Sequence, residues 1–168
     1  MIEPLWTQGG QGVEGWREAP LGDLVIHIIE QFHMPARVEM ARMETLVEEA
    51  VLLEGAAHPG VLAVREEVGR FCRDFRAHMA LEERSVFPLL LAAEAGAGRM
   101  SPLWPRPEDG HEAETGLFRQ LRDLSSACLP APGARNLRAR LNSSFRAMEK
   151  SLQIHLLLET QVLFRRAF

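Results

Sequence analysis

Two segments of the chain repeat one arrangement of histidine and glutamate. Residues 78–87 read His-Met-Ala-Leu-Glu-Glu-Arg-Ser-Val-Phe, and residues 155–164 read His-Leu-Leu-Leu-Glu-Thr-Gln-Val-Leu-Phe. Both fit His-x-x-x-Glu-x-x-x-aliphatic-Phe, and the second copy lies 77 positions after the first. Because residues four apart share one face of an α-helix, each segment presents an imidazole and a carboxylate to the same side. These two groups are common ligands of transition metals.

Two further histidines extend the repeat. His33 and His111 are 78 positions apart, so the chain reads as two copies of one helical hairpin. The midpoint between His33 and His78 falls in the turn-like segment 55–60, and the midpoint between His111 and His155 falls in the turn-like segment 129–133. Residues equally far from a hairpin turn lie level with each other. We therefore expect both hairpins to bring their ligands to one level.

The expected site contains four imidazoles and two carboxylates. Its members are His33, His78, Glu82, His111, His155 and Glu159. This set in a bundle core suits two iron ions, with the carboxylates bridging them. A single His-x-x-x-Glu is usually a surface helix pair, and a lone histidine on an apolar face is usually a packed core residue. Neither alternative explains why both midpoints fall on turns, so the sequence predicts a metal centre.

Apolar residues at helical spacing predict the elements that hold these side chains. The expected helices run from Leu21 to the turn at 55–60, from about Val61 to Glu94 with Pro88 bending it, from about Glu108 to Cys128, and from the turn at 129–133 to the C-terminus. Residues 95–107 are a proline- and glycine-rich linker, and residues 1–20 lack a helical period and read as an N-terminal arm. The sequence predicts an all-α, antiparallel up-down-up-down four-helix bundle over residues 21–168.

Composition excludes several classes of protein. Hydrophobic residues make up 46% and charged residues 25%, as in ordinary soluble domains. The net charge of −4 and the lack of a basic stripe argue against nucleic acid as a partner. No apolar run of 18 residues and no signal pattern appears, so we expect a cytoplasmic protein without a membrane partner. Cys72 and Cys128 then read as reduced, apolar packing residues.

The two remaining histidines are predicted to lie outside the metal site. His58 is 25 residues from His33, about 37 Å along a helix, and Glu54 is nearly as far. His27 precedes His33 by six residues, or about 9 Å, and is expected to pack rather than to bind metal.

The paired motifs resemble the hemerythrin-like (HHE cation-binding) family, and most closely the C-terminal half of its RIC ("repair of iron centres") group. The resemblance covers about residues 16–168 and includes the stretch from Ala19 to His33 and both His-x-x-x-Glu-x-x-x-x-Phe segments. It implies a non-haem di-iron centre with carboxylate and oxo bridges. The four site histidines would be terminal ligands, and Glu82 and Glu159 would be bridges. The chain departs from the group at Glu54, where a histidine is usual, at Arg165, which replaces a proline, and in having no room for the group's N-terminal cysteine-pair domain.

The resemblance implies two classes of function. The first is a stress-response protein that repairs iron–sulfur proteins, delivers iron to them, or handles nitric oxide. The second is a dioxygen-binding or redox-sensing module. Oxygen carriers of the family use a fifth histidine on the third helix, whereas Pro107 and Thr115 stand at the corresponding positions here. This difference favours the first class. Di-iron oxidase chemistry, and with it enzymatic activity, stays open, although the absence of tyrosine excludes a tyrosyl radical.

Overall fold

A computed structural model describes residues 13–96, 108–128 and 135–166, and for residues 13, 14, 108–116 and 128 it describes the backbone alone. The described elements are α1 (Val13–Glu18), α2 (Leu21–Ile28), η2 (Ile29–His33), α3 (Met34–Glu54), α4 (Gly60–Leu81), η3 (Glu82–Val86), α5 (Phe87–Glu94), α6 (Glu108–Cys128), α7 (Arg135–Leu158), η5 (Glu159–Leu163) and η6 (Phe164–Arg166). The segments η2, η3 and η5 are π-helical, and η6 is a 3₁₀ turn. No strand occurs in these ranges.

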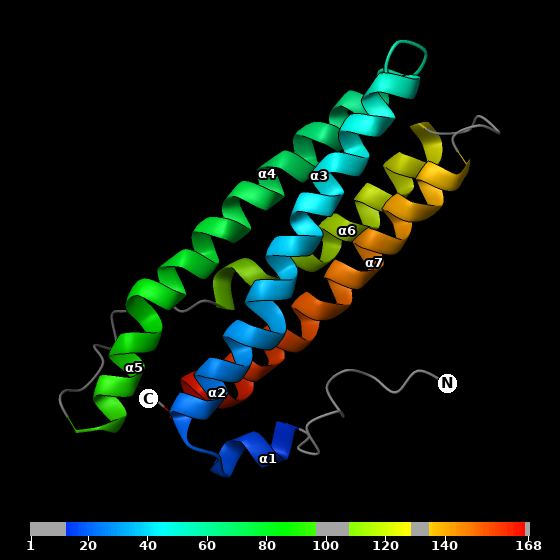
Figure 1. Ribbon diagram of the computed structural model, residues 1–168. Coiled ribbons are helices and arrows are strands. Elements are labelled where there is room, and N and C mark those ends of the chain that lie inside the picture. The colour runs from blue at the N-terminus through cyan, green and yellow to red at the C-terminus, as the bar shows by residue number, and fades with distance from the viewer. Residues whose placement is uncertain (1–12, 97–107, 129–134, 167–168) are drawn as a thin grey trace.

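Four long helical rods form the bundle, as the sequence predicted (Figure 1). Each π-helical segment continues the helix before it, so that α2–η2–α3, α4–η3–α5 and α7–η5 each form one rod. Helix α3 packs against α4 and α7, and α6 packs against the same two helices on the other side. None of the described helices is both long enough and apolar enough to cross a membrane.

The bundle contains two separate apolar clusters. The larger one fills the four-helix part with residues such as Met40, Phe75, Phe118 and Phe145. The smaller one joins α2, η3, α5, η5 and η6 through the side chains of Leu21, Leu24, Val25, Ile28, Val86, Phe87, Leu90, Val162, Leu163 and Phe164. On the α2–η2–α3, α4–η3–α5 and α7–η5 rods, the predicted ligands fall where residues of the larger cluster give way to residues of the smaller one.

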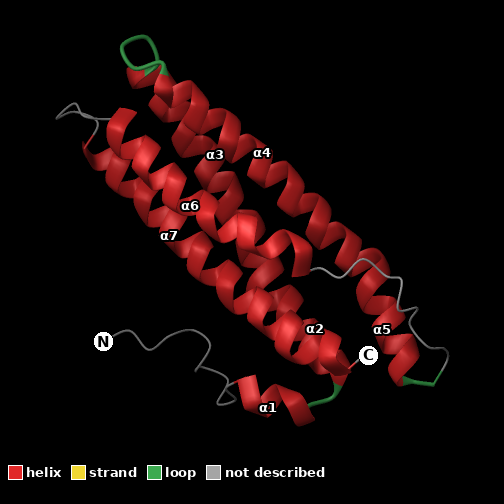
Figure 2. Ribbon diagram, turned by 180° about the vertical axis from the view of Figure 1, so that it is seen from behind, coloured by secondary structure: helices red, strands yellow, loops and turns green. Residues whose placement is uncertain are grey.

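Helix α6 covers only one end of the bundle. Figures 1 and 2 show it beginning part-way along the other rods, so that α2, α5 and the C-terminal segment extend beyond its start. The first turn of α6 contains His111, and α6 packs on the helices that carry His78 and His155. The backbone of α6 therefore begins close to the boundary between the two apolar clusters.

Part of the expected N-terminal arm is helical. Helix α1 has six residues, which is too short to show a helical period in the sequence. The Trp16 ring lies 4.4 Å from the His27 ring and packs on the smaller apolar cluster. Arg166 donates hydrogen bonds to the Trp16 and Ala19 carbonyls and to Glu94. Tertiary contacts thus hold this segment. Residues 1–12 of the arm, most of the linker at 95–107 and the turn at 129–133 lie outside the described residues.

Candidate metal centre

Four of the six predicted ligand side chains meet between the two apolar clusters. The ligand atoms of His33, Glu82, His155 and Glu159 all lie within 4.8 Å of one another. The His33 and His155 Nε2 atoms are 3.1 Å apart, and His155 Nε2 lies 2.6 Å from Glu159 Oε1. His33 Nε2 is 3.4 Å from Glu82 Oε2. Each residue is at most 2% exposed. This group, called the His/Glu cluster below, has side chains of the type, spacing and burial that could hold a metal ion.

His78 lies at the edge of the His/Glu cluster. Its Nε2 atom is 3.2 Å from Glu82 Oε1, one helical turn further along the chain. The His78 ring stacks on Phe75, with centroids 5.8 Å apart. Its side chain is 25% exposed, whereas the four clustered side chains are almost fully buried. Among the described members of the predicted ligand set, His78 therefore has the most exposed side chain, although its Nε2 atom is itself buried.

The side chain of His111 lies outside the described residues. The helix that carries it is present, and α6 packs against both α4 and α7. The assignment of His111 as a ligand stays a prediction.

Aromatic rings form the walls of the cluster. Phe32 stacks on the His155 ring at 5.8 Å, and Phe87 stacks on the His33 ring at 5.7 Å. Phe75 meets His155 edge-on at 6.1 Å. These contacts limit the orientations of both imidazoles and exclude water from their faces. The low polarity also strengthens every charge interaction inside the cluster.

The carboxylates show that the cluster is short of positive charge. Burial raises the pKa of the Glu159 carboxyl well above its ordinary value, and the neighbouring Glu82 charge raises it further. Burial also acts to raise the pKa of Glu82, but the imidazoles of His33 and His78 outweigh it and hold that pKa well below its usual range. One of the two carboxyls thus ionises at the expense of the other, as is typical of closely paired acids.

Several oxygen atoms at this site also lack hydrogen bonds. Within the described part of the chain, both Glu82 oxygens and Glu159 Oε2 are buried without a hydrogen-bond partner. Leaving such atoms unsatisfied in an apolar interior costs several kcal/mol. A bound cation would satisfy these oxygens and would stabilise both carboxylates in their ionised form. The residues present therefore fit a metal centre.

Three of the four rods have a π-helical segment at this level. His33 ends η2, Glu82 begins η3, and Glu159 begins η5. Such segments insert an extra residue into a helical turn and are frequent at functional sites. Pro35 and Pro88 follow the starts of η2 and η3 by six residues, and the wider turn accommodates the missing proline N–H. Arg165 stands at the same position after η5, so a proline is not required for the π-helical turn.

Sequence reasoning missed the residues that hold His33. The Nδ1–H group of His33 donates to Glu83 Oε1 at 2.7 Å, because a carboxylate can only accept. Arg37 in turn donates to both oxygens of Glu83, at 2.8 and 3.0 Å. A proton on Nδ1 leaves the Nε2 lone pair directed into the His/Glu cluster, as a metal ligand requires. The signals in the sequence were Glu83, the glutamate directly after Glu82, and Arg37, the arginine one turn after His33.

The residues excluded from the sequence-predicted site lie away from the cluster. His58 is in the turn after α3 and pairs with Glu54 at 3.8 Å. His27 packs between the rings of Trp16 and Phe32, and burial lowers its pKa. Cys72 is a buried free thiol, and burial raises its pKa to about 12, so it is inert as a nucleophile.

Comparison with known proteins agrees with this geometry. The chain is 29% identical over 154 residues to the iron-sulfur cluster repair protein YtfE of Pectobacterium carotovorum, covering 90% of this chain and 68% of that protein. It is 26% identical over 155 residues to the iron-sulfur cluster repair protein DnrN of Neisseria gonorrhoeae, covering 90% and 94%. The model of the Hemerythrin HHE cation binding domain family matches residues 24–167. The chain therefore belongs to the hemerythrin HHE cation binding domain family.

Proposed function

We propose that this protein holds a non-haem di-iron centre and acts in the repair of iron–sulfur centres, in the cytoplasm. The observation that carries the proposal is the buried His/Glu cluster, in which two imidazole nitrogens 3.1 Å apart face two carboxylates. The proposed ligands are His33, His78, Glu82, His111, His155 and Glu159, with Glu82 and Glu159 as bridges. Two relatives named as iron-sulfur cluster repair proteins support the proposed role.

Different residues of the chain would have different roles at such a centre. His33 is oriented by Glu83, and His155 is held between aromatic rings, so these two ligands are rigid. Glu82 lies between His33 and His78, so its two oxygens would be able to hold metal together with both imidazoles, which supports its proposed role as a bridge. When bound, iron would supply exchangeable positions for small molecules and a source of metal for another protein.

Iron that can leave the site suits a repair protein better than an oxygen carrier, which must keep its metal. Six protein ligands leave open positions on two metal ions. His78, a proposed ligand whose side chain is a quarter exposed, is on the solvent side of the site, where exchange would begin. The missing fifth histidine points in the same direction, since Pro107 and Thr115 occupy the positions where oxygen carriers have it. Nitric oxide and dioxygen are proposed as small-molecule ligands of this centre, and damaged iron–sulfur proteins as its partners.

A repair assay tests the function directly. An iron–sulfur enzyme is inactivated by nitric oxide or oxygen and is then incubated under reducing conditions with the iron-loaded protein. We expect its cluster absorbance and activity to recover. The metal-free protein and the Glu159→Ala variant should give no recovery. Equal recovery with free ferrous iron at the same concentration would contradict the proposed role while leaving the metal site intact.

A further inference from the structure

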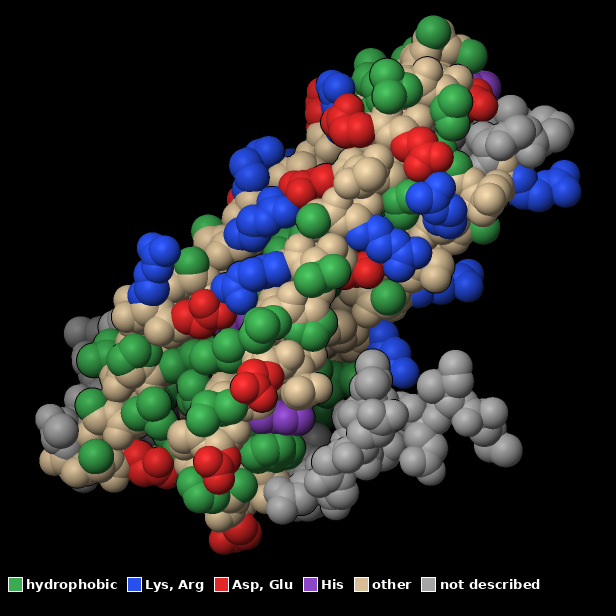
Figure 3. Space-filling view, in the orientation of Figure 1, with side chains coloured by type: hydrophobic (Ala, Val, Ile, Leu, Met, Phe, Trp, Pro, Cys, Tyr) green, Lys and Arg blue, Asp and Glu red, His purple; other side chains and the backbone are tan. Residues whose placement is uncertain are grey.

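The outward face of α7 carries an excess of positive charge on a protein that is negative overall. Helix α7 has five basic residues and one carboxylate: Arg135, Arg138, Arg140, Arg146, Lys150 and Glu149. The whole chain has a net charge of −4. The sequence pattern gave no sign of a basic stripe, because the residues are spread over 16 positions and gather only on the folded helix. Figure 3 shows Lys and Arg side chains along the edge of the molecule where α7 runs.

The carboxylates at the flanks of α7 are already engaged. Glu49 of α3 pairs with Arg140 at 3.1 Å, and Glu149 pairs with Arg122 of α6. Glu39 of α3 accepts a hydrogen bond from Ser144. Among the described residues, no carboxylate forms an ion pair with Arg135, Arg146 or Lys150, all of which are exposed. Within the described part of the chain, the charges of Arg135, Arg146 and Lys150 are therefore not neutralised by an ion pair.

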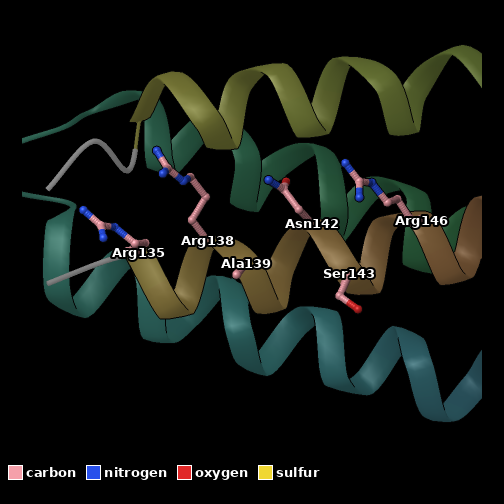
Figure 4. Close-up of a pocket in the computed structure, with 6 residues that line it drawn as sticks. All are labelled: Arg135, Arg138, Ala139, Asn142, Ser143 and Arg146. Atoms are coloured by element: carbon pink, nitrogen blue, oxygen red, sulfur yellow. The ribbon is translucent and has the colours of Figure 1, made fainter. Parts of the chain in front are cut away.

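Three of the arginines line a shallow pocket. The pocket has a volume of about 390 Å³, and its lining comes from α7 alone: Arg135, Arg138, Ala139, Asn142, Ser143 and Arg146. Figure 4 shows the three arginine side chains and Asn142 extending from the same side of the helix. Small side chains at Ala139 and Ser143 leave space beside them. Guanidinium, amide and hydroxyl groups together are suited to binding carboxylates by charge-assisted hydrogen bonds.

Helix stability does not explain this arrangement. The first turn of α7 contains no acidic residue and begins with Arg135. The N-terminus of a helix carries partial positive charge and favours acidic residues, so arginines there oppose the helix dipole. An external anion would be attracted by the arginines and by the helix end together.

We propose that this face of α7 docks the acidic surface of a partner protein. Residues 135–150 extend about 22 Å along the helix axis, which is comparable to the width of an ordinary protein interface. The negative charge of the whole chain and the paired carboxylates on both flanks oppose the extended anionic field of nucleic acid or of a lipid surface. Discrete carboxylates on a folded partner can match the narrow basic face instead.

The docking face is on the same helix as the metal ligands. Arg146 precedes His155 by nine residues, or about 14 Å along the axis. A protein bound at this face would lie beside the part of the bundle that contains the His/Glu cluster. The docking proposal does not depend on the metal, because it rests on charge and exposure alone.

Fluorescence anisotropy at low ionic strength tests the proposal on the full chain. The probe is a fluorescein-labelled glutamate-rich peptide, with a short DNA duplex and vesicles containing phosphatidylglycerol as competing classes of anion. The test variant is Arg135→Gln/Arg146→Gln. The matched control is Arg65→Gln/Arg73→Gln, which removes two exposed arginines from α4 and changes the net charge equally.

We expect the peptide to bind, and the α7 variant to weaken its binding roughly fivefold, since exposed ion pairs contribute modestly. The α4 control should bind like the unmodified protein, and salt at about 0.15 M should weaken all binding. Equal weakening in both variants, or no binding of the peptide, would overturn the proposal. Tighter binding of the duplex or the vesicles would overturn the choice of an acidic protein as the partner.

Discussion

Replacing Glu83 with alanine should weaken metal binding without touching a proposed metal ligand. Glu83 accepts the Nδ1–H of His33 at 2.7 Å and is held by Arg37. A carboxylate that orients a metal-bound histidine typically contributes 10–100-fold to metal affinity, or about 1.4 to 2.8 kcal/mol. Glu83→Ala removes this contact and frees the His33 ring to change tautomer. Glu83→Gln keeps an acceptor without the charge, so its loss of affinity should be smaller.

The chain contains a matched control for this variant. Glu44 and Arg76 form another ion pair between α3 and α4, at 2.7 Å, with side chains 39% and 40% exposed. The Arg37–Glu83 pair has 39% and 27% exposed side chains and a separation of 2.8 Å. Pairs with this exposure contribute about 0.2 to 1 kcal/mol, so Glu83→Ala and Glu44→Ala should lose similar ion-pair stability in the metal-free protein. Glu83→Ala should lose about 1 to 3 kcal/mol more, because it leaves the buried His33 Nδ1–H without its acceptor. Only the first should lose metal affinity.

The assay is a competition for ferrous iron against a chelator of known affinity, under anaerobic conditions, with urea unfolding of the metal-free forms in parallel. The expected result is a 10–100-fold weaker affinity for Glu83→Ala and an unchanged affinity for Glu44→Ala. Equal affinities for both variants would refute the role given to Glu83. A loss in both would show that helix pairing, and not the orientation of His33, controls the site.

Three further predictions follow from the site. The iron-loaded protein should melt at a higher temperature than the metal-free one at neutral pH, because metal binds the folded state. Differential scanning calorimetry should show this difference in melting temperature closing as pH falls through roughly 6, because the proposed imidazole ligands must be neutral to bind metal. Glu159→Gln should stabilise the metal-free protein at pH 7, because the native pKa of Glu159 is raised. The unmodified protein therefore loses stability as the pH rises from the unfolded pKa near 4.5 towards the native pKa, whereas the variant does not. Thermal melts should show the advantage of the variant disappearing at about pH 4, and its persistence there would contradict the reasoning. The reduced, iron-loaded protein should oxidise in air without a reversible oxygenated spectrum, and a mild chelator should remove its iron within minutes to hours. Repeated spectral cycles with iron retained would instead favour oxygen binding.

Much of the fold could be predicted because apolar spacing and turn composition agree along the chain. The second rod ends at Glu94 and the third helix spans Glu108–Cys128, as expected. Distance from the turns also predicted that His33, Glu82, His155 and Glu159 would approach one another, since residues equally far from a hairpin turn lie level.

Other features had weak or ambiguous signals. A π-helical turn adds one residue to a helical period, and the prolines at 35 and 88 were the visible hint. Arg165, in the same position after η5, shows that the hint is incomplete. Glu83 resembles any surface acid beside a buried one, and only the packing of α3 against η3 brings it to His33. Helix α1 depends on contacts of Trp16 with residues that follow it in the chain.

The iron content of the isolated protein tests the central proposal most directly. The protein and two variants, Glu159→Ala and His58→Ala, are loaded with ferrous iron anaerobically, freed of excess metal by gel filtration, and analysed for iron per chain. We predict about two iron ions per chain for the unmodified protein and for His58→Ala, whose histidine lies in the turn beside Glu54. Glu159→Ala should hold neither ion while keeping its helical circular dichroism spectrum. Two tightly held ions in Glu159→Ala, or a single ion in the unmodified protein, would contradict a carboxylate-bridged di-iron centre at the His/Glu cluster.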